Sequence, residues 1–237
     1  MLGVVVLGFV FIRTGMAVVS WFTPDYRMLP PSMPKLESRL QDYVEIKGLK
    51  KNLETKTLTG KAVIVDKDKA SLHPLMRGLP KSIRATTPED VDFVIWIDAE
   101  RVPDPDHQVS AAAKPTPQEI AAWNASHPSG SGMPLRTVAV PTYKAKWTAT
   151  VIDLKKKEIK STRSFTGPSL PSGELDFRSS WFSGQDRLYV DDKMIKGAEV
   201  IFGDKGDVFI GGKRLAGVVA PTPWDETLNW IGQLIKP

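Results

Sequence analysis

The sequence predicts an α+β protein with a mostly antiparallel sheet, covered by a C-terminal helix and preceded by one transmembrane helix. Three observations lead to this fold class: an apolar run at the N-terminus, several segments rich in β-branched and aromatic residues, and an amphipathic C-terminal segment. The 237 residues are 41% apolar and 25% charged, which is ordinary for a globular chain and excludes overall disorder. The absence of cysteine excludes disulfides and thiolate metal sites.

Residues 1–22 form the apolar run, in which only Arg13, Thr14 and Ser20 are polar. About 20 apolar residues are needed to cross a bilayer core, so the length fits one membrane-spanning helix. Trp21 lies where an interfacial aromatic belt is expected. A cleaved signal peptide and a buried core helix are the alternatives, but the start lacks the basic residues and the Ala-x-Ala pattern of a signal peptide.

Residues 23–34 contain four prolines, which favour an extended, stiff spacer between the membrane and a globular domain at 35–237. The flanking charges at Arg27, Lys35 and Arg39 would by themselves favour a cytoplasmic domain. Long domains can translocate regardless of such charges, so the count does not decide the orientation. We expect a single-pass membrane protein with an extracytoplasmic domain, and a cytoplasmic domain is the alternative.

Hydrophobic periodicity indicates the elements of this domain. Helical spacing of apolar residues predicts a short helix over 35–46. Continuous apolar runs predict buried strands at 61–66 and 93–98. The segments 146–153 and 158–165, joined by a polar turn, predict a β-hairpin.

Three Thr-Pro pairs predict helix starts, at Thr87, Thr116 and Thr222. In each, threonine is expected at N-cap, proline at N1 and a carboxylate at N3, where the carboxylate favours the helix dipole. The last of these helices carries an apolar face that should dock on the sheet, made of Trp224, Leu228, Ile231 and Ile235.

Two segments, 101–137 and 172–217, are expected to be insertions in the domain. The first is rich in proline, alanine and glycine, which indicates a surface excursion. The second contains a weak repeat, in which 188–193 aligns with 208–213, and each copy reads as strand, tight turn and strand. Two copies predict a small β-meander rather than a solenoid.

One set of motifs resembles an uncharacterised domain of bacterial secreted or membrane-attached proteins. The motifs are Leu79-Pro80, residues 83–91 (IRATTPEDV) and residues 150–154 (TVIDL), followed by a final amphipathic helix. The resemblance covers roughly residues 59–171 and 221–235. It implies an envelope location and no assigned activity, so it supplies no catalytic residue.

One acidic stretch (DAERVPDPDH) is the candidate for metal or hydrolytic chemistry, because carboxylates with an imidazole can hold a divalent ion. An arginine and two prolines interrupt it, so a solvated acidic loop is the competing interpretation. Its titratable residues are Asp98, Glu100, Asp104, Asp106 and His107.

The three histidines show no metal-ligand spacing, and no serine lies in a G-x-S-x-G motif. We therefore assign no catalytic, cofactor-binding or metal-binding residue.

A basic group lies on the predicted hairpin. We expect mainly a solvated hairpin, with weak contact of Lys155, Lys156 and Lys157 to anionic lipid, and we do not expect nucleic-acid binding. The group comprises Lys144, Lys146, Lys155, Lys156, Lys157, Lys160 and Arg163.

These patterns favour a membrane-tethered, non-enzymatic envelope domain with a binding or structural role. The alternative is a hydrolase or metal-dependent enzyme with its site around Asp98, Asp104, Asp106 and His107. The two differ in whether those side chains converge on one pocket.

Overall fold

A computed structural model describes residues 32–53, 57–127, 135–179, 186–204, 207–210 and 213–237. The expected membrane helix 1–22 and most of the linker 23–34 lie outside these residues. Within the part that is described, no helix has both the length and the apolarity needed to span a bilayer. The mixed α and β composition and the helix near the C-terminus are confirmed.

The helices are α2 (Pro34–Glu37), α3 (Leu40–Val44), α4 (Pro117–Ser126) and α5 (Trp224–Leu234), with 3-10 turns η2 (Pro74–Arg77) and η3 (Pro88–Asp90). The strands of the first half are β1 (Lys50–Lys51), β2 (Leu58–Thr59), β3 (Ala62–Asp66), β4 (Ser71–Leu72), β5 (Phe93–Pro103), β6 (Val109–Ala113) and β7 (Arg136–Val140). Those of the second half are β8 (Thr142–Asp153), β9 (Glu158–Thr166), β10 (Gly173–Ser179), β11 (Asp186–Val190), β12 (Lys193–Met194), β13 (Glu199–Phe202), β14 (Phe209–Ile210), β15 (Lys213–Val219) and β16 (Ile235–Lys236).

The larger sheet has the central order β1-β9-β8-β5-β3-β4, with β15 joined in parallel to the start of β8. Its two longest ladders, β5 with β8 and β8 with β9, are antiparallel, whereas β3 runs parallel to β5. The predicted hairpin is therefore present as β8 and β9. Strand β5 continues five residues beyond the predicted end at residue 98, because β8 is long enough to pair with it throughout.

Both faces of this sheet are covered, which explains why its strands appear in the sequence as continuous apolar runs. In the β5–β8 register Trp96 lies opposite Thr150, and Trp147 lies opposite Ala99, so the two indoles belong to opposite faces. The Trp96 Nε1–H donates to the Tyr43 carbonyl oxygen at 2.7 Å, which ties one face to α3. On the other face Trp147 packs near Trp224 of α5, with 6.4 Å between ring centroids.

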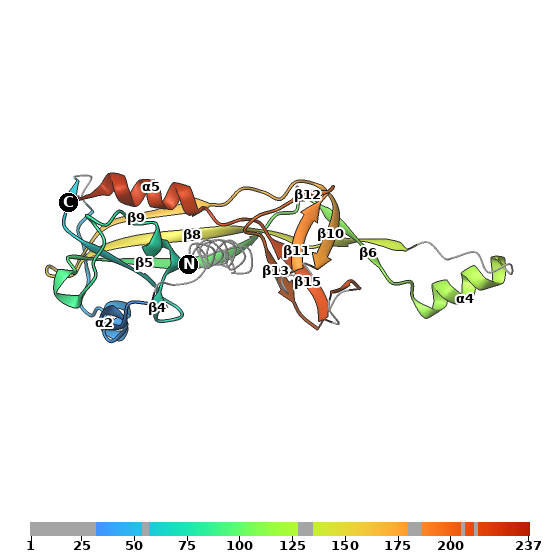
Figure 1. Cartoon of the computed structure of the whole chain (residues 1–237), viewed down its shortest axis with the longest axis horizontal. Coiled ribbons are helices and arrows are strands. Elements are labelled where there is room, and N and C mark those ends of the chain that lie inside the picture. The colour runs from blue at the N-terminus through green and yellow to red at the C-terminus, as the bar shows by residue number, and fades with distance from the viewer. Residues whose placement is uncertain (1–31, 54–56, 128–134, 180–185, 205–206, 211–212) are drawn as a thin grey trace, which may run out of the picture.

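Helix α5 lies along the larger sheet (Figure 1). Ile231 is fully buried, and Trp224 and Leu228 are partly buried against the same core. A Cβ atom at Gly78 would collide with the Leu228 side chain, so glycine at the end of η2 allows the close approach of the helix. The predicted docking of the helix is thus confirmed for Ile231, with Ile235 buried just beyond the helix in β16.

The segments expected as insertions build most of a second sheet, of order β12-β11-β10-β6-β7. It has its own apolar core, shared with β15 and including Val109, Leu175, Leu188 and Val218. The two repeat copies form hairpins, β11–β12 and β14–β15, that belong to different sheets. The turn of the first copy is formed by Asp191 and Asp192, both at positive φ, whereas the Gly-Gly turn of the second copy lies outside the described residues.

Only one of the three Thr-Pro pairs forms the predicted helix cap. The Thr116 hydroxyl accepts from the Glu119 amide, and the Glu119 carboxylate accepts from the Thr116 amide, which completes a capping box for α4. At Thr87 the prediction of a helix is wrong, because only the three-residue turn η3 follows and the chain then enters β5. At Thr222 the cap is displaced, and Pro223 is the N-cap of α5.

Helix α4 projects from one end of an elongated molecule, whereas α2 lies at the opposite end (Figure 1). It buries none of its residues. Its stability therefore depends on the capping box and on local contacts such as the stacking of Trp123 on His127, with 3.7 Å between ring centroids.

Candidate functional site

The junction between the two sheets is built on a tight turn, Asp104-Pro105-Asp106-His107, between β5 and β6. Asp at the first position and Pro at the second are typical of such turns. The His107 amide donates to the Asp104 carbonyl at 3.3 Å and closes the turn. The Thr142 hydroxyl lies 2.8 Å from the Asp104 carbonyl oxygen and 2.6 Å from that of His107, so the start of β8 holds the turn in place.

The carboxylate of Asp104 is the centre of this junction. Only 3% of the residue is exposed. Its Oδ1 lies 3.2 Å from His107 Nδ1 and 3.2 Å from Lys144 Nζ. The His107 and Lys144 side chains are partly exposed, so the two partners of the buried carboxylate extend to the protein surface.

The second carboxylate oxygen, Asp104 Oδ2, is enclosed and has no hydrogen-bond partner. Burial raises the pKa of Asp104, but hydrogen bonds from His107, Ser169 and Lys144 outweigh burial and hold the pKa below its ordinary value. Asp104 is therefore ionised at neutral pH. Ser169 lies near enough to lower this pKa, yet it does not satisfy Oδ2 with good geometry. A buried carboxylate oxygen that accepts no hydrogen bond lowers the stability of the folded state. Asp104 Oδ2 is such an atom.

A cavity of about 350 Å³ opens beside Asp104. Most of its lining is apolar, and a few polar groups lie among the apolar ones. Small-molecule sites in most proteins have this composition, in which the polar groups orient the ligand. The Tyr143 ring is packed against Gly217 of β15, where a Cβ atom would approach Tyr143 Cε2 to 2.8 Å. The lining residues are Pro103, Asp104, Pro105, Gln108, Ala139, Val140, Pro141, Thr142 and Tyr143.

The structure brings together only part of the acidic stretch that the sequence singled out. Asp104 and His107 are in contact, as described above. Glu100 instead pairs with Lys146 at 2.9 Å, Asp98 lies opposite Thr148 within the β5–β8 ladder, and Asp106 is exposed. Across the described part of the chain, no group of three or more His, Asp or Glu side chains could hold a metal ion.

Sequence reasoning missed the other members of the junction. Lys144 was assigned to the basic hairpin, 40 residues away from Asp104, and the antiparallel β5–β8 register brings it beside the turn. Ser169, Gln108 and Tyr143 carried no motif that could have identified them. The only available signal was the Asp-Pro turn itself.

The basic group on the hairpin does not form one continuous patch, because opposite charges neutralise much of it. Lys155 pairs with Asp92 at 2.7 Å, and this partner raises the pKa of Lys155 and lowers that of Asp92. Lys160 is buried and lies 2.6 Å from Glu158. Lys144 and Lys146 belong to the junction half of β8, far along the strand from the turn at Lys155–157.

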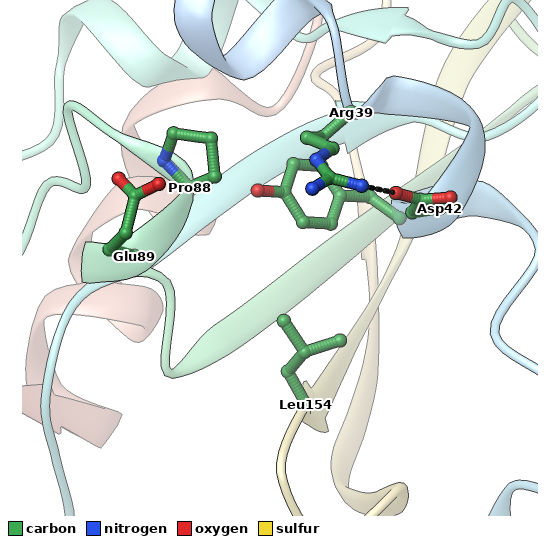
Figure 2. A pocket seen from close by; sticks show the side chains of 6 residues that line it. Arg39, Asp42, Pro88, Glu89 and Leu154 are labelled. Atoms are coloured by element: carbon green, nitrogen blue, oxygen red, sulfur yellow. Dashed lines mark hydrogen bonds and ion pairs between the residues drawn. The ribbon is translucent and has the colours of Figure 1, made fainter.

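A second cavity, of about 310 Å³, lies at the end of the molecule where the described chain begins. Figure 2 shows Arg39 and Asp42 paired on one side of it, with Pro88 and Glu89 across from them and Leu154 from the β8–β9 turn. Tyr43 also lines it, and its buried hydroxyl has no hydrogen-bond partner. Burial raises the pKa of Tyr43, so this phenol is neutral.

Comparisons of the chain with protein-family models, curated proteins and solved structures find no significant match. The junction and the basic turn must therefore be interpreted from their own geometry.

Proposed function

We propose that the protein is a single-pass, membrane-tethered, non-enzymatic domain of the bacterial envelope, which binds a partner at a distance from the bilayer. The apolar run 1–22 supports the tether, since its length matches one membrane-spanning helix. The Pro-rich segment 23–34 supports a stiff spacer between membrane and domain.

The observation that carries the proposal is the position of the basic turn relative to the N-terminal end of the described chain. Leu154, just before Lys155–157, lines the same cavity as Arg39 and Tyr43 of the first helices. The amide of Lys50 also donates to the Lys157 carbonyl at 3.0 Å. A membrane helix preceding α2 would therefore orient the lysines of the turn toward the bilayer, with the spacer 23–34 in between, so that their attraction to anionic lipid is weak.

The far end of the molecule supports a binding role. Helix α4 lies at the opposite end of the long axis from α2 (Figure 1). The junction cavity is lined by residues of the β5–β6 turn and the start of β8, at the other end of β8 from the turn Lys155–157. A tether at the α2 end leaves these features accessible to a partner in the surrounding envelope. The extracytoplasmic position is supported only by the sequence motifs at 79–91 and 150–154, which no family model matches.

Membrane fractionation tests the tether. The full chain should sediment with membranes and resist extraction at alkaline pH, whereas a chain truncated to begin at Lys35 should remain in the supernatant. Protease added to intact cells with a permeabilised outer layer should digest the domain if it is extracytoplasmic. A full chain with an intact N-terminus that stays in the supernatant would contradict the proposal.

The contact between Asp104 and His107 favours a second candidate function, hydrolysis. A buried carboxylate on Nδ1 orients an imidazole and leaves Nε2 available as a general base. The test is turnover of chromogenic ester and phosphoester substrates by the purified full chain. Activity that is lost in both Asp104→Asn and His107→Gln would support the hydrolase, and inactivity would leave the binding role.

A further inference from the structure

One edge of the larger sheet is open over part of its length. Strand β9 pairs with β8 on one side, and on its other side β1 pairs only with Glu158 and Ile159. Within the part of the chain that the structure describes, no strand continues this pairing alongside residues 162–166. The opening ends at Gly167, where a Cβ atom would collide with the Pro221 carbonyl oxygen. Residues 162–166 therefore form an open edge.

The backbone of the open edge directs hydrogen-bonding groups away from the sheet. The Gly167 amide donates to the Ala145 carbonyl at 2.7 Å, which makes this a hydrogen-bonded pair at the end of the antiparallel β8–β9 ladder. Such pairs alternate with pairs whose amides and carbonyls point away from the neighbouring strand. Counted from Gly167, the outward-pointing residues are Thr162, Ser164 and Thr166, and all three are exposed. A row of such groups is a template for an added strand.

Basic side chains determine which strand fits. Arg163 is exposed and lies 5.3 Å from the centre of the Phe165 ring, and among the described residues no carboxylate pairs with it. Lys50 and Lys51 of β1 are also exposed at this side of β9. The Phe165 ring contacts Trp230 of α5, with 5.5 Å between centroids, so Arg163 lies on the α5 face as well. An acidic side chain on that face of an added strand would pair with Arg163.

The opposite face of the open edge carries hydroxyl groups. Ser164 Oγ lies 2.9 Å from Thr148 Oγ1, and Thr162 Oγ1 lies 3.5 Å from Thr150 Oγ1. Uncharged β-branched side chains are favoured beside such a pleated surface. Because successive residues of a strand face opposite sides, the strand that fits alternates acidic and β-branched residues.

We propose that the open edge binds an extended acidic segment of another protein as an additional strand. Its main chain bonds to Thr162, Ser164 and Thr166, and one of its carboxylates pairs with Arg163. In this mode of recognition the main-chain hydrogen bonds give affinity, and the side chains give selectivity. This inference rests on the proposed binding role and states the chemistry of the partner.

A second copy of the chain fits this edge less well. Two copies of β9 related by a two-fold axis perpendicular to the sheet would run antiparallel. Because β9 follows the long axis of the molecule, the α2 ends of the two copies would point in opposite directions (Figure 1). Two chains tethered to one membrane by the segment before α2 do not adopt that arrangement.

A designed peptide of alternating valine and glutamate, V-E-V-E-V-E-V, tests the proposal by titration of the full chain in detergent. It should bind with a dissociation constant below about 1 mM, and raising NaCl from about 0.1 M to about 0.5 M should weaken binding by more than about twofold. The peptide V-K-V-K-V-K-V reverses the charge and should bind more weakly. Absence of binding by the acidic peptide, or equal binding by the two, would overturn the proposal.

Two methylated peptides separate strand pairing from charge alone. One carries N-methyl groups on its valines and the other on its glutamates, so both keep the charge and differ in which amides remain. Only alternate amides of an added strand face β9. One of the two peptides should therefore lose binding while the other retains it, and equal binding would overturn strand addition.

Amide hydrogen exchange locates the peptide. In the free chain the outward amides of Thr162, Ser164 and Thr166 should exchange faster than those of Arg163 and Phe165, which face β8. The acidic peptide should slow the exchange of all three outward amides, and unchanged exchange would overturn the assignment to β9. Slowing that grows with chain concentration in the absence of peptide would identify a second copy as the occupant and would also overturn the proposal.

A matched pair of variants tests the charge. Arg163→Gln should weaken binding of the acidic peptide by about fivefold, as an exposed ion pair does, with an unchanged unfolding midpoint. Lys193→Gln is the control, since Lys193 is exposed on β12 of the second sheet. Equal effects of the two variants would overturn the pairing with Arg163.

The outcomes also separate this inference from the proposed function. If the chain sediments with membranes but binds no acidic peptide, the partner chemistry is wrong and the tether stands. If the full chain stays in the supernatant and binds the peptide at β9, the strand site stands and the tether is wrong.

Discussion

The imidazole of His73 meets the indole of Trp147 edge to face, with 4.9 Å between their ring centroids. His73 Nδ1 also accepts from the Leu75 amide at 3.2 Å and so caps the turn η2. Burial is the main cause that lowers the pKa of His73, to about 4, with nearby Asp66 acting in the opposite direction. The histidine is thus a neutral core residue at physiological pH.

The buried histidine predicts a pH-dependent stability. Its folded pKa of about 4 lies below the unfolded value of 6.5, so between these pH values the unfolded chain binds a proton that the folded chain does not. The free energy of unfolding should therefore fall by about 3 kcal/mol as pH decreases from 6.5 to 4, and this contribution should be constant above pH 7.

Urea unfolding at several pH values measures this effect. His73→Asn keeps an acceptor for the Leu75 amide and removes the titration, so the slope between pH 4 and 6.5 should decrease. His127→Asn is the control, since His127 is exposed at the end of α4. An identical slope in His73→Asn and the wild-type chain would contradict the prediction.

Docking of α5 predicts unequal effects along the helix. Leu228→Ala removes contacts with the core beside Gly78 and should lower the free energy of unfolding by about 2 kcal/mol, the low end for leucine truncations because the side chain is partly buried. Asp225→Ala should cost about 0.3–1 kcal/mol, as a first-turn carboxylate does. Equal small losses in urea unfolding would mean that α5 contributes little to the core.

The basic turn predicts weak, salt-sensitive binding to anionic vesicles. The test uses a chain truncated to begin at Lys35. Changing Lys155, Lys156 and Lys157 together to Gln should remove most of the vesicle binding. Charge dominates this binding because Trp147 and Val151 of the hairpin are buried and cannot insert into the bilayer. Cosedimentation with phosphatidylserine vesicles measures it. The unfolding midpoint should change little, since the Lys155 side chain of the Lys155–Asp92 pair is largely exposed.

A matched variant removes the same charge elsewhere. Lys193, Lys196 and Lys213 are exposed on the second half of the molecule, and their change to Gln should leave most vesicle binding intact. If both triple variants lose equal affinity, net charge rather than the turn is responsible.

The capping box predicts a local effect in α4. Thr116→Ala removes the acceptor for the Glu119 amide and should destabilise the helix by about 1 kcal/mol. Because α4 buries no residue, hydrogen exchange of its amides should accelerate while the global unfolding midpoint stays constant. Thr116→Ser retains a hydroxyl and should restore slow exchange; failure to do so would argue against the cap.

Local patterns in the sequence predict four strands of the larger sheet, β3, the first part of β5, β8 and β9, together with the α4 cap and the helix α5. In each case residues that are close in the sequence predict the element. Continuous apolar runs predict β3 and β5, two β-branched segments joined by a polar turn predict the hairpin, and a Thr-Pro-x-Glu motif predicts the start of α4. The Thr-Pro motif failed at Thr87 because the following strand β5 begins only three residues after η3, which leaves no room for a helix.

The junction was decided only by tertiary structure. The sequence placed Asp104 and His107 in one acidic stretch, but the extended register of β5 and the Asp-Pro turn separate them from Asp98 and Asp106. The antiparallel pairing of β5 with β8 brings Lys144 to the buried carboxylate across 40 residues of sequence, and no local pattern encodes such a pairing. Charge balance at Asp104 therefore depends on strand register, because the register determines which side chains meet.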